Sequence, residues 1–181
     1  MSSTTRRDVL TVAAAASLAA VSGINSAIGE ERVASGPAFD DQHSPVPLPF
    51  DPKSLKGISE KLIQSHWENN YTGAVKALNT LRARLPQALA DPNTPPYVYT
   101  GLKREQLLRT GSVVLHEYYF ANLGGSGKPS ADLRSRIASS FGTYDAWEAE
   151  YRKIGAGLGG GSGWVVLGFN RKRKQIGRAH V

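Results

Sequence analysis

The stretch QSHWENNY (residues 64–71) places a histidine, a tryptophan and two asparagines in the middle of an amphipathic pattern. Apolar residues recur around it at spacings of three and four, which predicts a helix over 59–86 that Ser59 caps and Pro86 ends. A histidine within this pattern is either a satisfied core residue or a ligand. The predicted buried stripe consists of Leu62, Ile63, His66, Ala74, Ala77, Leu78, Leu81 and Leu85.

A second helix is predicted over 103–122, after a turn at 92–96, and two glycines at 124 and 125 end it. His116 lies beside its apolar stripe. Two shorter helices are predicted over 130–141, capped by Ser130, and over 143–155, before a glycine-rich turn and a β run over 164–169. The stripe of the second helix consists of Leu107, Leu108, Gly111, Val114, Leu115, Tyr118 and Tyr119.

Helices followed by the opening strand of a sheet predict an α+β fold. A strand needs partners for its backbone donors and acceptors, but the following RKRKQIGRAHV is short and highly charged. We therefore expect that only the first strand of an antiparallel sheet is present. The final IGRAHV resembles one reading frame of a common sequencing adapter. Residues 171–181 are thus expected to be a basic turn and a non-native tail, which removes His180 from the candidate ligands.

The amino-terminal segment 1–29 resembles a twin-arginine export signal, because two arginines precede a short alanine-rich apolar run. This predicts a periplasmic or otherwise exported protein without a membrane anchor after cleavage. Residues 30–48 are rich in Pro, Asp, Ser and Gly, which is typical of a linker or of an arm lying on the surface. His43 in this segment is expected to be a solvated loop histidine.

The composition of the 181 residues limits the chemistry. The chain has no cysteine, so any metal must be bound through nitrogen and oxygen. Its formal charge of +7 is concentrated at the end, where residues 171–181 hold five basic residues and no acidic one. The remainder is nearly neutral, and we expect no nucleic-acid partner. The histidines of the chain are His43, His66, His116 and His180.

Four blocks of sequence, taken together over residues 47–170, resemble the iron/manganese superoxide dismutase family. The blocks are SHWENNYTGAVKALN (65–79), LHEYYFANLGG (115–125), SFGTYDAWEAEY (140–151) and GGGSGWVVLGFN (159–170). The resemblance implies a helical-hairpin domain over 49–125. It also implies that an α/β domain with an antiparallel sheet begins at 126–170.

The resemblance also implies a set of site residues. His66 matches the metal-ligating histidine of the family's first helix, and His116 matches the ligand of the second helix. Trp164 matches a tryptophan that lines the active site. The family's usual gateway tyrosine is Ala74 here, so Tyr71, one turn earlier, is expected to close the substrate funnel and relay protons. The implied surrounding residues are Asn70, Ser112, Tyr119 and Phe120.

Two further ligands of the family, an aspartate and a third histidine, come from a D-x-W-E-H-A-Y motif that this chain lacks. Ser112 stands where iron-type members often carry a glutamine, so the resemblance leaves iron or manganese open, with one ion per subunit. The implied activity is the conversion of superoxide to oxygen and hydrogen peroxide by a full-length homodimer. We expect this chain to be an inactive fragment.

Other functions fit the sequence less well. His116 and Glu117 begin a zinc-peptidase motif, but the second histidine is absent. The glycine-rich run GAGLGGGSG (155–163) lacks the lysine and hydroxyl residue of a phosphate-binding loop, and LGGSGKPS (123–130) lacks the full spacing of that motif. The remaining alternative is a non-catalytic periplasmic helical domain that binds a partner through Trp67, Tyr71 and Tyr118 and contains structural histidines.

Overall fold

The computed structural model describes residues 41–159 and 163–180. The predicted export signal and most of the predicted linker lie outside these residues. The described chain begins with an extended arm (41–50), which continues into a short 3-10 helix, η1 (Pro52–Ser54). No helix of the described part is long and apolar enough to cross a membrane.

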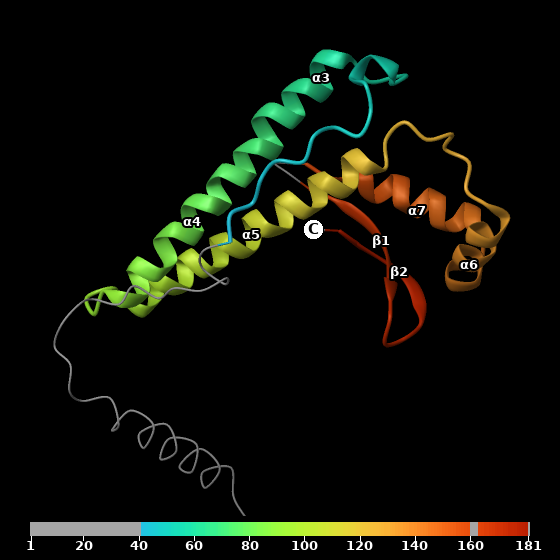
Figure 1. Cartoon of the computed structure of the whole chain (residues 1–181). Coiled ribbons are helices and arrows are strands. Elements are labelled where there is room, and N and C mark those ends of the chain that lie inside the picture. Colours follow the sequence, from blue (N-terminus) through green and yellow to red (C-terminus); the bar gives the residue numbers. More distant parts are fainter. Residues whose placement is uncertain (1–40, 160–162, 181) are drawn as a thin grey trace, which may run out of the picture.

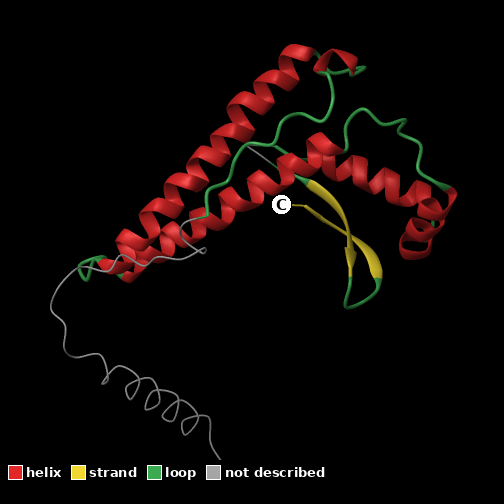
Figure 2. Cartoon of the chain, viewed as in Figure 1, coloured by secondary structure: helices red, strands yellow, loops and turns green. Residues whose placement is uncertain are grey.

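A helical hairpin forms the first half of the molecule, and the arm runs between its two helices (Figures 1 and 2). The first rod consists of α3 (Glu60–Ser65), a π-helical segment η2 (His66–Tyr71) and α4 (Thr72–Ala90). The second rod is α5 (Pro96–Ala121), which packs along α4. Ser59 caps the first rod as predicted, because its Oγ accepts a hydrogen bond from the amide of Leu62 at 3.2 Å.

The wide turn of η2 brings Tyr71 onto the buried face of the first rod. The amide of Thr72 donates to the carbonyl of Trp67, five residues earlier, as in a π-helix. Ile63 and Tyr71 are both fully buried although eight residues separate them. Two turns of α-helix take about seven residues, so the wider turn absorbs the extra residue.

The hydrophobic core of the hairpin lies where η2, α4, α5 and the arm meet. Leu48 and Phe50 of the arm pack against this core, and the rings of Trp67 and Tyr119 lie at its edge. The arm therefore covers apolar surface in addition to bridging the two helices. The buried members of the core are Tyr71, Ala74, Val75, Leu78, Val113 and Phe120.

The second half contains two helices and a β-hairpin. Ser130 caps α6 (Ala131–Phe141) and Thr143 caps α7 (Tyr144–Ala156), in agreement with the predicted helices. Strand β1 (Val165–Asn170) pairs antiparallel with β2 (Gln175–His180), in a register that sets Val165 opposite His180 and Asn170 opposite Gln175. Helix α7 contacts β1, and α6 contacts β2.

The expectation of a single strand was wrong, because residues 175–180 form β2. A tight turn at 171–174 allows the chain to fold back, and the amide groups of Lys172 and Arg173 both donate to the side chain of Asn170. The pairing satisfies backbone groups of β1 whatever side chains the partner carries. Backbone pairing therefore outweighs the high charge that argued against a strand.

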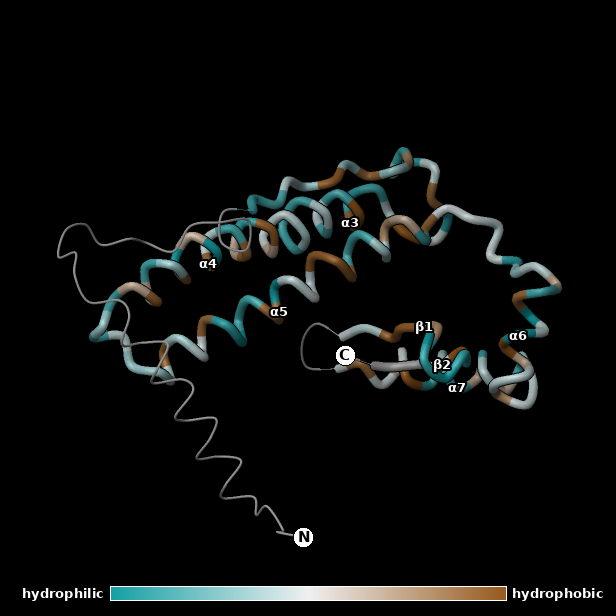
Figure 3. The backbone as a smooth tube through the Cα atoms, turned by 60° about the horizontal axis from the view of Figure 1, so that its bottom comes forward, coloured by the Kyte–Doolittle hydropathy of each residue, from teal (hydrophilic) through white to brown (hydrophobic). Residues whose placement is uncertain are grey.

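Pro86 does not end the first rod, which continues to Ala90. A proline inside a helix removes one backbone hydrogen bond, but Leu85 and Pro86 are both buried against the neighbouring elements. Several predicted core residues of α3 and α5 are exposed instead, and on α5 the described residues cover only one side of the helix. Figure 3 shows hydrophobic positions recurring along this helix. The exposed residues are Leu62 (58%), Leu107 (73%), Leu108 (57%), Val114 (39%) and Tyr118 (64%).

Asn79→Ala tests the docking of the arm. The Asn79 side chain accepts from the amide of His43 at 2.9 Å and donates to its carbonyl at 2.9 Å. Losing two partly buried hydrogen bonds should lower the free energy of unfolding by about 1–3 kcal/mol, measured by urea denaturation. The matched control is Asn69→Ala, whose exposed side chain bonds only Ser65 of its own rod. A control loss as large as that of Asn79→Ala would contradict the prediction.

Candidate metal centre

Two histidines from the two rods of the hairpin face each other at its centre. His66 is the first residue of η2, and His116 lies in the last third of α5 with 4% of its surface exposed. Their Nε2 atoms are 3.1 Å apart, and their ring planes meet at 80°. The fold therefore brings together the two histidines that were predicted as metal ligands, which are 50 residues apart in sequence.

The tautomer of His116 follows from its neighbour one turn earlier. The Nδ1 atom of His116 lies 2.7 Å from the carbonyl oxygen of Ser112, which can only accept a hydrogen bond. Nδ1 therefore carries the proton, and the lone pair of the neutral ring is on Nε2, facing His66. Ser112 contacts the Nδ1 side of the ring, whereas His66 faces Nε2, and the Oγ of Ser112 lies 3.4 Å from Nδ1.

Both imidazoles are held in the neutral form. Burial lowers the pKa of His66, and the nearby His116 lowers it further. Burial also lowers the pKa of His116, although its hydrogen bond to the Ser112 carbonyl acts in the opposite direction. Neutral imidazole is the form that binds a metal ion, so the site is prepared for coordination at neutral pH.

An aromatic shell surrounds the pair. The ring of Trp164 lies 4.9 Å from that of His116, and the rings of Tyr119 and Phe120 lie 5.4 and 5.5 Å from that of His66. A pocket of about 420 Å³ opens beside the two histidines. Five of the predicted site residues line it, together with Tyr151, Gly163 and Val165: they are His66, Asn70, His116, Tyr119 and Trp164.

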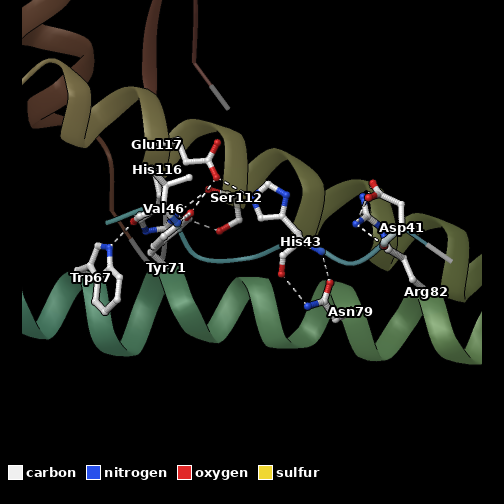
Figure 4. A network of polar contacts seen from close by, with 10 residues as sticks. All are labelled: Asp41, His43, Val46, Trp67, Tyr71, Asn79, Arg82, Ser112, His116 and Glu117. Atoms are coloured by element: carbon white, nitrogen blue, oxygen red, sulfur yellow. Dashed lines mark hydrogen bonds and ion pairs between the residues drawn. The ribbon is translucent and has the colours of Figure 1, made fainter. Parts of the chain in front are cut away.

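Tyr71 contacts the site only through its ring, whose centre lies 6.1 Å from that of His116. Its hydroxyl points away from the pocket toward the arm, where it donates to Glu117 Oε1 at 2.8 Å and accepts from the amide of Val46 at 2.8 Å (Figure 4). Burial raises the pKa of this hydroxyl, so it remains a donor. The structure therefore places the proposed gateway hydroxyl outside the pocket.

Sequence reasoning missed three residues near the site. His43 is not a solvated loop histidine, because its Nε2 lies 2.7 Å from Glu117 Oε1 and only 30% of its side chain is exposed. The sequence indicates Glu117 only as part of an incomplete zinc-peptidase motif. Tyr151 lines the pocket, and its hydroxyl donates to the carbonyl of Val165 at 3.0 Å. A contact such as that of His43 with Glu117, 74 residues apart, leaves no local pattern in the sequence.

The two facing nitrogens fit a metal ion. Their separation of 3.1 Å suits two ligands at neighbouring positions of one ion, since metal–imidazole bonds are about 2.1 Å long. Nitrogen donors of this kind suit iron, zinc, copper and nickel. Within residues 41–159 and 163–180, no group of three or more His, Cys, Asp or Glu side chains is positioned to hold an ion. The described residues therefore provide two donors.

The fold and the site define a helical hairpin that presents one buried and one partly buried imidazole to an aromatic pocket. The chain is 48% identical over 124 residues to the iron superoxide dismutase of Cupriavidus metallidurans. The match covers 68% of this chain and 62% of that protein. It is 35% identical over 125 residues to the iron superoxide dismutases of Aquifex aeolicus and Aquifex pyrophilus. In both cases the match covers 66% of this chain and 57% of the relative.

The chain is thus related in sequence to iron superoxide dismutases and spans about three fifths of the length of the curated relatives that it matches. No family model matches it. The α+β class expected from the sequence agrees with the helical hairpin and the small antiparallel sheet.

The lowered pKa values of His66 and His116 predict acid-sensitive stability in the metal-free protein. The unfolded histidines take up protons near pH 6.5, whereas burial keeps the folded ones neutral to lower pH. The unfolded state then binds more protons, so the free energy of unfolding should fall as the pH drops below 6.5. Urea denaturation between neutral and mildly acidic pH measures this loss. It should be smaller in the double variant His66→Gln, His116→Gln, and an identical loss would contradict the prediction.

Proposed function

We propose that this chain is part of a superoxide dismutase of the iron/manganese family. The single observation that carries the proposal is the convergence of the His66 and His116 Nε2 atoms, 3.1 Å apart, inside an aromatic pocket. The sequence similarity to iron superoxide dismutases supports it. The substrate is superoxide, and the products are oxygen and hydrogen peroxide.

His66 and His116 would hold the metal, which supplies the one-electron oxidation and reduction when bound. The Ser112 carbonyl keeps the His116 proton on Nδ1, so Nε2 remains available to the metal. Trp164, Tyr119 and Phe120 surround the histidine rings and limit the access of water. Asn70 and Tyr151 line the pocket beside the two imidazoles, and a small anion approaches along them.

Iron is the metal that we favour over manganese, because the similar proteins are named as iron enzymes. We further propose that an aspartate and a third histidine, supplied from outside the described residues, complete the coordination. The full-length enzyme would be a homodimer. An export signal over residues 1–29 and a periplasmic location also belong to this proposal, as does a non-native origin of residues 176–181.

The alternative of a binding domain with structural histidines has less support. Of the three aromatic residues that would contact a partner, Tyr71 is fully buried, and Trp67 packs against the core and donates to the Val46 carbonyl. Tyr118 is exposed. One exposed ring does not make an interface, whereas the two facing imidazoles make a metal site.

Metal analysis of the full-length gene product tests the assignment. The purified protein should contain close to stoichiometric iron or manganese, and His66→Ala or His116→Ala should remove most of it, because each variant loses a ligand nitrogen. Gln64→Ala is the matched control, since Gln64 is exposed on α3 and its side chain bonds only Glu60. Unchanged metal content in both histidine variants would favour the binding domain.

Expression of residues 30–175 alone tests the incomplete coordination. We expect little or no dismutase activity from it, because the described residues hold two ligand nitrogens and no group of three donors. The measurement is a superoxide-consumption assay after loading with iron or manganese. Robust activity would show that this part of the chain completes the site by itself, contrary to our proposal.

A further inference from the structure

The arm is held to the first rod mainly through its backbone, and the carboxylate of Asp41 also lies 3.4 Å from the Arg82 guanidinium. The side chain of Asn79 bonds the amide and carbonyl of His43, the indole of Trp67 donates to the carbonyl of Val46 at 2.9 Å, and Arg82 donates to the carbonyl of Asp41 at 2.8 Å. These hydrogen bonds fix the position of the arm's backbone. They place no demand on the side chain at position 43.

The arm contacts α5 through the side chain of His43, which reaches the side chain of Glu117. Glu117 Oε1 accepts from the Tyr71 hydroxyl and lies 2.7 Å from His43 Nε2 (Figure 4). One carboxylate oxygen therefore connects the arm, η2 and α5. About seven tenths of the Glu117 and His43 side chains is shielded from solvent, since their exposed fractions are 29% and 30%.

The position of Glu117 relates this connection to the histidine pair. Glu117 follows His116 directly in α5, and Tyr71 ends the π-helical segment that His66 begins. Among the hydrogen bonds of the described residues, two join η2 to α5, namely His66 to His116 and Tyr71 to Glu117. A metal bound between the Nε2 atoms would replace the first contact, so only the second persists in both states.

The ring of Tyr71 transmits this constraint. It lies 6.1 Å from the rings of His116 and Phe120 and 6.2 Å from that of Trp67, and the residue is fully buried. Its hydroxyl bond to Glu117 therefore limits both the sliding of η2 along α5 and the tilt of the His116 ring. The spacing of the two Nε2 atoms depends on these same degrees of freedom.

We propose that Glu117, held by His43 of the arm and bonded to Tyr71, is a positioning residue that sets the spacing of the His66–His116 pair for metal binding. This inference rests on the proposed function, because it assumes that the pair binds a metal ion. It assigns Tyr71 to the support of the site from the side opposite the pocket.

Binding of Co²⁺ to this chain tests the inference, because its visible absorption reports both the affinity and the ligand geometry. Glu117→Ala should weaken binding by about tenfold, the lower end of the effect of residues that orient metal ligands, and should change the absorption spectrum. Tyr71→Phe, which keeps the ring and loses the hydroxyl, should do the same. Glu117→Gln should restore most of the affinity, since its amide oxygen still accepts from Tyr71.

Glu105→Ala is the matched control, because Glu105 lies on the same helix and its carboxylate bonds only Arg109. Circular dichroism establishes which variants are folded. If Glu117→Ala does not fold, Tyr71→Phe decides the question. Wild-type affinity and spectrum in the folded Glu117 and Tyr71 variants would overturn the positioning role and leave the proposed function intact. If the wild-type chain binds Co²⁺ no more tightly than the His66→Ala, His116→Ala double variant, both the positioning role and the proposed function are overturned.

Discussion

The complete burial of Tyr71 is the constraint on which the rest of the structure depends. Its ring fills the space between the two rods, and its hydroxyl needs partners because an unpaired buried polar group is costly. The arm supplies the Val46 amide and α5 supplies the Glu117 carboxylate. Three segments that are far apart in sequence therefore meet at one oxygen atom, and the histidine pair lies beside it.

The π-helical turn makes this arrangement possible. His66 is its first residue and Tyr71 is its last. One local widening of the helix therefore places His66 at the pocket and the Tyr71 hydroxyl at the arm. π-helical turns occur often at functional sites. The turn and the pairing of η2 with α5 together set two neutral imidazoles in contact inside an aromatic shell, where a redox metal can be held.

Local sequence patterns predicted the elements of the fold well. Ser59, Ser130 and Thr143 begin helices because a side-chain oxygen there accepts from a backbone amide of the first turn. The prediction failed where neighbours decide the outcome. Pro86 stays inside α4 because it is buried, and Leu107 is exposed because nothing among the described residues covers that side of α5. The strand β2 forms because β1 offers its backbone.

The sequence by itself determined the helices and their caps, because these follow from spacing along one chain, and its resemblance to iron/manganese superoxide dismutases pointed to His66 and His116 as ligands of one metal ion. Only the tertiary structure decided that His43 contacts Glu117 and that the Tyr71 hydroxyl faces the arm. These features depend on distances between segments that are separated by tens of residues. Such distances are set when the helices pack and the wide turn of η2 rotates one face against another, and spacing along the chain does not encode them.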